Sequence, residues 1–352
     1  MAEDVGKKLL GEVEEAGLDE ILHTLRLQHG SPTEYFGLPP LDRLLQAATD
    51  ARPQALKAST AQPTIELMSL APGGDKTHVL YHLCALAVLP KTFGGKQACA
   101  VIVDTDGKFS VSRLAAQLEQ LLREHHTPEA PAETTSTAIE EELLAALRHI
   151  HIFRPPSLPS AIATLDSLQT YLFDKARHYS FDRQVAFIAI DSASSFYWQD
   201  RAETEDAAFV ASTSTSTTGS KVPALQSAYV QLATSLRNTT QTFSCPAIIT
   251  AWHLNNLPPS NASRGYRPQL PALQPTLRLV MRRLPVRKFP PGISLEQALR
   301  EAGDRQKAVE EAKFECFVNE WGMDERVLQA LQRVGGGFDF TVEEDGVSME
   351  EG

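Results

Sequence analysis

The spacing of the hydrophobic positions changes near residue 64. Before it, apolar residues within the first 28 positions recur at helical spacing, which predicts one or two amphipathic helices. After it, short apolar runs alternate with helical patterns. Strands are predicted at residues 64–69, 99–104, 150–153, 185–191, 246–251 and 276–284, and helices at residues 77–88, 111–124, 139–148, 160–177 and 223–237. Apolar strands with intervening helices are typical of the α/β class, with a mostly parallel, twisted central sheet flanked by helices.

Three stretches of low complexity interrupt this alternation. Residues 127–138 are rich in Pro, Thr and Ala. Residues 202–222 are rich in acidic residues with Ser and Thr, and residues 255–275 are rich in Pro and Asn. Such compositions predict mobile loops. Farther on, the sequence predicts a charged exposed helix over residues 294–314, because Ser294 and Gln297 have capping-box spacing. A short hairpin and an acidic tail are expected at the end.

The bulk composition restricts the class of protein. The 352 residues, 42% of them hydrophobic, suffice for one large α/β domain, or for one domain with an appendage. We divide the chain into an N-terminal helical extension with its linker, residues 1–62, and a core, residues 63–352. The formal charge of −11 argues against a general polyanion binder. Dispersed cysteines, no signal-peptide pattern and no long apolar run predict an intracellular, soluble protein without disulfides or a bound metal centre.

One strand–turn–helix junction carries candidate chemistry. The stretch SLAPGGDKT, residues 69–77, lies where a phosphate-binding loop of the pattern G-x-x-x-x-G-K-[ST] is expected, between a strand and a helix. Lys76 and Thr77 match the end of that pattern, whereas Leu70 and Asp75 stand at its two glycine positions. The alternative is a surface lysine in an ordinary turn, but the strand before it and the helix after it favour a degenerate phosphate loop.

The replaced glycines weaken the expected site. A side chain there obstructs the approach of phosphates or the turn with positive φ, although Gly73 and Gly74 keep the loop flexible. The Asp75 carboxylate beside a phosphate adds a repulsion of roughly 4 kcal/mol at about 4 Å and an effective dielectric constant of about 20. The sequence therefore predicts that ATP with magnesium binds weakly or not at all.

Two acidic residues follow predicted strands. Asp191 ends the apolar run VAFIAID, the usual place for an acid that organises magnesium, and Asp106 lies just past a strand end, where an acid can orient an attacking water. Asp is equally favoured in helix caps and turns, and that alternative stays open for both. If the protein is an active enzyme, Asp106 is its candidate catalytic residue.

With these motifs in order, the chain resembles the RecA-family recombinases, and among them the eukaryotic recombinase paralogs. The resemblance covers roughly residues 33–284 and is carried by YFGLPPLDRLL, by Lys76-Thr77, by THVLYHLCALAVLP, by VIVDTDGKF and by IAIDSASSFYWQDR. Its most specific element is the aromatic triplet Phe196-Tyr197-Trp198, followed by Asp200-Arg201.

This resemblance implies a RecA-like core with a short N-terminal extension, in a nuclear protein of homologous-recombination DNA repair. It implies one subunit of a recombinase-paralog complex, with the D-type paralog as the expected neighbour. Such a subunit assists loading of the main recombinase on single-stranded DNA without strong ATPase activity of its own. The alternatives are an active DNA-stimulated ATPase and a RecA-like regulatory protein outside repair.

The chain departs from the family pattern beyond its phosphate loop. Trp252 stands where the family has a polar residue that senses the γ-phosphate, and Asp106 stands where active recombinases carry glutamate. The Phe-x-x-Ala hook used in filament assembly is missing ahead of the core. Its one occurrence, Phe173 to Ala176, falls in a predicted core helix and is interpreted as packing. These departures argue against an independent, ATP-driven filament former.

Candidate contacts with DNA lie in the segments that follow the fourth and fifth predicted strands, since in RecA-like cores the loops after these strands face DNA. The loop at residues 198–222 has a net charge of −2, which is unfavourable for phosphates, whereas residues 253–295 contain no acid and carry +7. The candidates are Arg264, Tyr266, Arg267, Arg278, Arg282, Arg283, Arg287 and Lys288, with Tyr266 expected to stack on a base. A solvated basic strand edge is an equally good interpretation.

Candidate contacts with partner proteins lie ahead of the core. They are the amphipathic stretch at residues 1–28 and the pair Tyr35 and Phe36, since family members join neighbours through this segment. Packing within the chain is the alternative, and the sequence does not separate the two.

Overall fold

A computed structural model describes the chain in several ranges, which are residues 34–52, 61–70, 73–125, 132–213, 224–253, 264–268, 270–284, 286, 289–343 and 346–349. By its internal contacts the chain divides into two units, Met1–Tyr35 and Phe36–Gly352. All helices and strands described below belong to the second unit. The helices predicted within residues 1–28 lie outside the described residues, and the predicted boundary between residues 62 and 63 stays a prediction.

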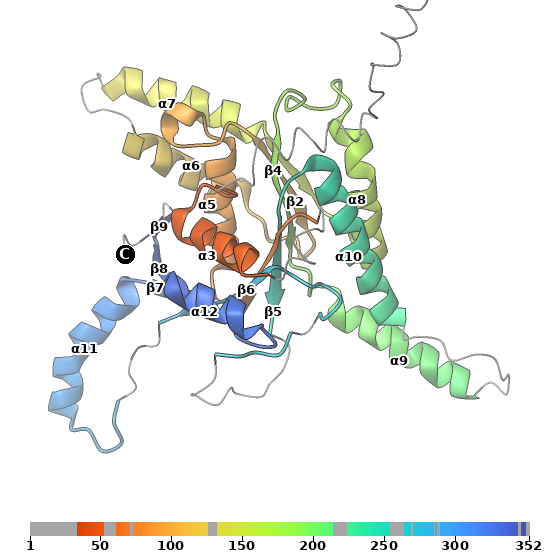
Figure 1. The fold of residues 1–352 in the computed structure, drawn as a ribbon. Coiled ribbons are helices and arrows are strands. Elements are labelled where there is room, and N and C mark those ends of the chain that lie inside the picture. The colour runs from red at the N-terminus through yellow and green to blue at the C-terminus, as the bar shows by residue number, and fades with distance from the viewer. Residues whose placement is uncertain are drawn as a thin grey trace, which may run out of the picture. The chain divides into compact units, whose positions relative to one another are not determined.

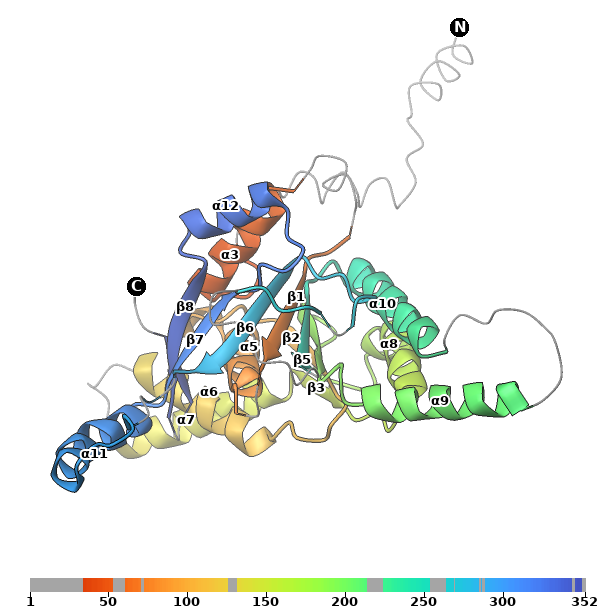
Figure 2. The ribbon, with the colours of Figure 1, turned by 90° about the horizontal axis from the view of Figure 1, so that it is seen from below.

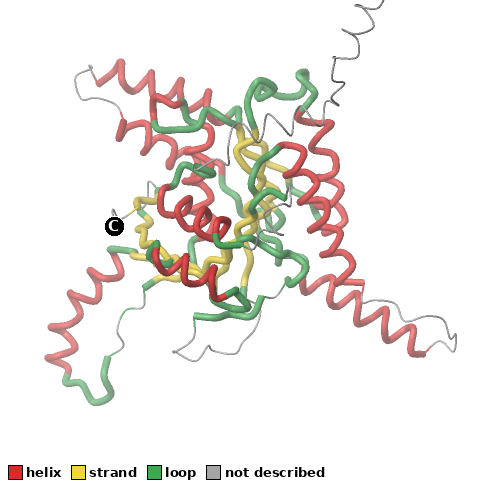
Figure 3. Tube along the Cα trace, viewed as in Figure 1, coloured by secondary structure: helices red, strands yellow, loops and turns green. Residues whose placement is uncertain are grey.

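Helices and strands alternate along most of the second unit (Figures 1 and 3). The helices are α3 (Pro39–Asp50), α5 (Lys76–Val88), the 3-10 helix η1 (Lys91–Phe93), α6 (Val111–His125), α7 (Ala132–Leu147), α8 (Leu158–Leu172), α9 (Tyr197–Thr213), α10 (Ala224–Phe243), α11 (Leu295–Glu310) and α12 (Glu325–Arg333). The strands are β1 (Thr64–Ser69), β2 (Cys99–Asp104), β3 (Ile150–Phe153), β4 (Val185–Asp191), β5 (Ala247–Trp252), β6 (Leu277–Arg283), β7 (Lys313–Val318), β8 (Gly337–Val342) and β9 (Val347–Met349). The predicted strands are confirmed to within one residue at each end.

One sheet joins all of these strands, in the order β3-β2-β4-β5-β1-β6-β7-β8-β9. The strands from β3 to β6 in this order pair in parallel, and β6, β7, β8 and β9 pair antiparallel. The predicted α/β class with a mostly parallel sheet is confirmed, and the arrangement is consistent with a RecA-like fold. The antiparallel part of the sheet was not predicted beyond its final hairpin.

Helices cover both faces of the parallel part, which explains why its strands are apolar throughout. Figures 1 and 2 show α8 and α10 side by side on one face, and α5, α6 and α7 on the other. Every residue of β2 and of β4 is buried. On the first face, Leu165 and Leu168 of α8 and Leu232 and Leu236 of α10 pack in one core cluster with the central strands. Burial on both faces is the usual requirement of a parallel sheet.

Two predicted loops are partly helical. Helix α7 begins at Ala132, inside the stretch predicted as a loop at residues 127–138, and α9 extends to Thr213, inside the stretch at residues 202–222. Long side chains with good helix propensity, such as the Glu residues of α9, outweigh the loop signal of the neighbouring Ser and Thr. The rest of those two stretches lies outside the described residues, as does much of residues 255–275.

In the C-terminal part, the helix predicted over residues 294–314 is shorter than expected, because it ends at Glu310 and strand β7 begins at Lys313. Helix α11 begins after Ser294, whose hydroxyl accepts a hydrogen bond of 3.2 Å from the Gln297 N–H, so the predicted cap is confirmed. Strands β8 and β9 form the expected hairpin. Within the described residues, no helix is long and apolar enough to cross a membrane.

Candidate functional site

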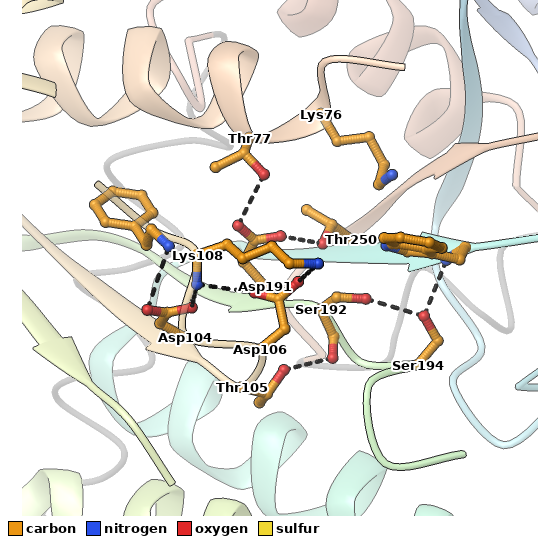
Figure 4. Close-up of polar contacts among 12 residues, drawn as sticks. Lys76, Thr77, Asp104, Thr105, Asp106, Lys108, Asp191, Ser192, Ser194 and Thr250 are labelled. Atoms are coloured by element: carbon orange, nitrogen blue, oxygen red, sulfur yellow. Dashed lines mark hydrogen bonds and ion pairs between the residues drawn. The ribbon is translucent and has the colours of Figure 1, made fainter. Parts of the chain in front are cut away.

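The candidate site lies at the carboxyl end of the parallel strands. Ser69, Asp104, Asp191 and Trp252 are the last residues of β1, β2, β4 and β5. These strands are neighbours in the sheet and run in parallel, so their final residues meet at one edge, where α/β proteins bind ligands. Figure 4 shows Lys76 and Thr77 at the start of α5 beside these strand ends.

The turn between β1 and α5 keeps a glycine-like backbone. Gly73 has a φ of 78°, which favours glycine, and a Cβ on Gly74 would lie 2.4 Å from the Cβ of Ser69, so position 74 needs glycine. Asp75 has a φ of 50°, in the left-handed region, which Asp enters more readily than most residues. The expectation that a side chain at position 75 obstructs this turn is therefore wrong for the backbone itself.

The Asp75 carboxylate has partners within its own chain. It lies 3.0 Å from Nδ1 of His78, one turn into α5, and Nε2 of His78 lies 2.9 Å from a guanidinium nitrogen of Arg113 on α6. The carboxylate is therefore linked through the His78 ring to the Arg113 guanidinium, a cation that partly offsets its repulsion of a phosphate.

Lys76 is buried, and its ammonium is held by the chain itself. It donates a hydrogen bond of 2.5 Å to the hydroxyl of Ser69 and lies 5.6 Å from the ring centroid of Trp252. Burial lowers the pKa of Lys76 to about 8, and the charge of Lys108 acts in the same direction. Nearby carboxylates, first that of Asp191, oppose this shift.

Asp191 is the buried centre of the site. Its carboxylate accepts a hydrogen bond of 3.1 Å from the Thr77 hydroxyl and another from the Thr250 hydroxyl (Figure 4). Burial raises its pKa and the charge of Asp106 adds to this, whereas the bonds from Thr250 and Thr77 and the charge of Lys76 lower it. Two of the predicted residues, Thr77 and Asp191, are thus brought into direct contact.

The loop after β2 brings Asp106 to the same edge. Its carboxylate lies 3.4 Å from the ammonium of Lys108 and accepts a 3.2 Å bond from the Lys108 N–H. Asp104, which ends β2, is held differently: it accepts bonds from the N–H groups of Lys108 and Phe109 and from the Arg154 guanidinium. Asp104 therefore fixes the loop, and Asp106 is left near Lys76 and Asp191.

The residues present fit magnesium better than they fit a phosphate chain. Thr77, Asp191 and Asp106 offer a hydroxyl and carboxylates, the hard oxygen ligands that magnesium prefers. Gly73 and Gly74 keep the turn shape of a phosphate cradle, but the Lys76 ammonium is already engaged. Within the described part of the chain, this site included, no group of three or more His, Cys, Asp or Glu residues is arranged to hold a metal ion.

Sequence reasoning missed three residues of this site, namely Ser69, Thr250 and Lys108. Ser69 and Thr250 lie at or near the ends of apolar strands. A polar residue in such a run indicates a candidate site residue, so the sequence did carry a signal for these two. Thr250 is fully buried and contacts Asp191, which lies on the neighbouring strand β4. Lys108 had no comparable signal, because its contact with Trp252 depends on the fold.

Several of the predicted DNA contacts are engaged within the chain. Arg278 forms a 2.8 Å ion pair with buried Glu66, Arg282 pairs with Glu315, and Arg283 donates a 2.5 Å bond to the Val309 carbonyl. On the same strand, β6, Leu277, Leu279 and Met281 are buried. Arg264, Arg267, Arg282 and Arg283 are exposed, and Arg287 and Lys288 lie outside the described residues.

Tyr266 is placed in the core rather than at a surface where a base can stack. It is 5% exposed and packs in a cluster with Met68, Val280 and Phe317. Its backbone exchanges two hydrogen bonds of 2.8 Å with the Asn319 side chain. The aromatic ring between two basic residues is thus a packing residue in this structure.

The predicted partner residues are also buried. Tyr35 is 6% and Phe36 1% exposed, and the Phe36 ring centroid lies 5.9 Å from that of Phe187 on β4. For Phe36 the structure favours packing within the chain. By contrast, the interpretation of Phe173 as core packing is wrong, because this residue follows the end of α8 and is 61% exposed.

Part of this chain is similar to known DNA repair proteins. No family model matches the chain. Mouse DNA repair protein XRCC2 is 33% identical over 129 residues, which are 37% of this chain and 39% of that protein. Human DNA repair protein RAD51 homolog 2 is 24% identical over 131 residues, which are 37% of this chain and 31% of that protein. The chain thus spans about two fifths and one third of the length of these relatives. The matches confirm that the chain is related to the RecA-family recombinase paralogs, XRCC2 among them.

Proposed function

We propose that this chain is a subunit of a recombinase-paralog assembly that acts in homologous-recombination DNA repair in the nucleus. The similarity to two DNA repair proteins, XRCC2 and RAD51 homolog 2, supports this role. The subunit joins other paralogs, with the D-type paralog as the expected neighbour. The assembly helps to load the recombinase on single-stranded DNA.

One observation supports a role without strong ATP hydrolysis. The Lys76 ammonium, which in a working phosphate loop contacts the phosphates, is bonded to Ser69 and covered by Trp252. Asp75 adds a carboxylate to the same turn. We propose that the site binds ATP with magnesium weakly and serves mainly as structure. If nucleotide enters, the turn at residues 73–77 holds its phosphates, Thr77 and Asp191 hold magnesium, and the ion neutralises phosphate charge.

Purification of the tagged full-length chain from its own cells, followed by mass spectrometry, tests the proposed partnership. We expect other recombinase paralogs among the stoichiometric partners. Their absence, together with normal survival of a deletion strain after DNA crosslinking, would contradict the proposal and favour a RecA-like regulator outside repair.

The second candidate is an active DNA-stimulated ATPase. The 3.1 Å bond between Thr77 and Asp191 favours it, because a hydroxyl and a carboxylate paired in this way offer ligands for magnesium, and the charge of Asp106 acts on Asp191. Calorimetry with ATP and magnesium separates the two candidates. Tight binding by the chain, alone or within its complex, and hydrolysis stimulated by single-stranded DNA would favour the enzyme.

A further inference from the structure

Trp252 and Ser69 are paired residues on neighbouring parallel strands. They are partners in the register of β1 and β5, and the His253 N–H donates a bond of 3.0 Å to the Ser69 carbonyl. Paired residues of adjacent strands project their side chains from the same face of a sheet. The Ser69 hydroxyl and the Trp252 indole therefore stand next to each other, and the Lys76 ammonium lies against both, at 2.5 Å and 5.6 Å.

A second ammonium lies against the same ring. Lys108, from the loop after β2, lies 5.1 Å from the Trp252 centroid. Its other contact is the Asp106 carboxylate at 3.4 Å. The indole therefore connects the turn that precedes α5 with the loop that carries Asp106, through cation–π contacts on both sides of the site.

The ring is the outer layer of this cluster. Trp252 is 38% exposed, whereas Lys76 is 8% exposed. Trp252 is also the last residue of β5, and its backbone is fixed by a 3.0 Å bond from its N–H to the Ser194 hydroxyl. The backbone is therefore anchored, while a half-exposed side chain at a strand end has solvent into which it can turn.

A phosphate needs the ammonium that this ring covers. Lys carries three N–H donors, and one of them is used by Ser69. Charge-assisted hydrogen bonds to phosphate require the remaining donors to face the ligand. In the observed arrangement the indole lies over the ammonium, so a phosphate oxygen that accepts from the remaining donors has to displace the ring.

We propose that Trp252 determines the affinity of this site for nucleotide: its indole covers the Lys76 ammonium, and a phosphate binds only when the ring turns away. This inference rests on the proposed weak nucleotide site and names the residue that makes it weak. It attributes the weak binding of nucleotide mainly to Trp252, whereas the sequence alone attributes it mainly to Asp75.

A measurement that needs no nucleotide tests directly whether the Trp252 indole covers the Lys76 ammonium. The full-length chain is treated with an amine-acetylating reagent at fixed pH, and acetylation of Lys76 is followed by mass spectrometry, with exposed Lys175 as internal standard. We expect acetylation of Lys76 to be several-fold faster in Trp252→Gln than in the native chain. In Trp321→Gln, which changes another half-exposed tryptophan away from the site, the rate should equal that of the native chain.

Calorimetry with ATP and magnesium tests the consequence for binding. Trp252→Gln should bind about tenfold more tightly than the native chain, which corresponds to about 1.4 kcal/mol, and Trp321→Gln should not differ from it. If circular dichroism shows that the Trp252→Gln variant does not fold, Trp252→Leu replaces it in both measurements. Leucine keeps an apolar side chain but removes the π face.

Unchanged acetylation of Lys76 would overturn the inference, and so would faster acetylation without tighter binding. These outcomes are distinct from failure of the proposed function. That function fails when no paralogs co-purify with the chain, a result that leaves the acetylation of Lys76 unaffected.

Discussion

The hydroxyl of Ser69, at the end of β1, accepts a 2.5 Å hydrogen bond from the ammonium of Lys76, at the start of α5. The strand before this turn thus provides a hydrogen-bond partner for the lysine that begins α5. This relationship explains how a lysine that is 8% exposed stays in place without a ligand. It also makes the site part of the stability of the fold.

Replacing Ser69 with Ala should destabilise the protein. The change leaves a buried ammonium without its hydrogen-bond acceptor, and the loss of a bond to a charged group costs about 1.5–3 kcal/mol. Urea unfolding followed by circular dichroism measures the effect. Ser167→Ala, on the exposed side of α8, is the control and should lie within about 0.5 kcal/mol of the native chain. Equal stability of the two variants would argue against a stabilising role of the Ser69 bond.

Gly74→Ala should disturb the turn more than Gly73→Ala does. The new Cβ at position 74 would lie 2.4 Å from the Cβ of Ser69, so the turn must move, whereas nothing lies within 4 Å at position 73. Gly73→Ala carries only the strain of a positive φ, about 1 kcal/mol. We expect the larger loss of thermal stability from Gly74→Ala. The reverse order would mean that the turn does not pack on β1 as described.

Arg278 should behave as a stabilising residue. Its guanidinium pairs with Glu66, whose side chain is 4% exposed, and burial raises the pKa of that carboxyl. Arg278→Ala leaves a buried unpaired carboxylate, and such a change costs about 3–5 kcal/mol. Arg282→Ala, at an exposed pair, should cost less than about 1 kcal/mol. Because acid protonates Glu66, the deficit of Arg278→Ala should shrink as pH falls. A deficit that stays constant with pH would contradict the buried pair.

Acid should destabilise the protein through a buried histidine pair. His149 and His151 both lie 2.9 Å from the Ser180 hydroxyl, and burial lowers the pKa of each to about 4. The unfolded chain, with a histidine pKa near 6.5, binds more protons between pH 6.5 and pH 4. Stability should therefore fall as pH falls through this window.

His149→Asn removes one titrating group of that pair while keeping a polar atom near Ser180. Its unfolding free energy should depend less steeply on pH between 6.5 and 4 than that of the native chain. Ser167→Ala, on the exposed side of α8, removes no titrating group and should leave the slope unchanged. Identical slopes for all three proteins would show that the pair does not govern acid stability.

The parallel half of the fold could be predicted because its strands carry their signal locally. The apolar run that ends in Asp191 identifies a buried strand, and the same run marks where an acid reaches the ligand edge. Helix α9 could not be predicted in the same way, since Ser/Thr-rich sequence beside it resembles a loop. Strand β7 was obscured by the charged helix before it.

The chemical details of the site depend on partners far apart in sequence. Lys76 and Thr77 were identified from a motif, but the sequence does not indicate that Ser69 would engage the lysine or that Trp252 would cover it. Likewise, Tyr266 between glycine and arginine resembles a base-stacking residue, and only the fold shows its ring packed on Phe317. Exposure is a property of tertiary packing, so local sequence does not specify it.

The most direct test of the proposed subunit is Lys76→Ala in the cells that make the protein. The variant should co-purify with the same recombinase paralogs in the same proportions as the native chain, and should restore survival of a deletion strain after DNA crosslinking. Loss of both assembly and survival, in a variant whose circular dichroism and unfolding match the native chain, would contradict a non-catalytic subunit and favour the ATPase.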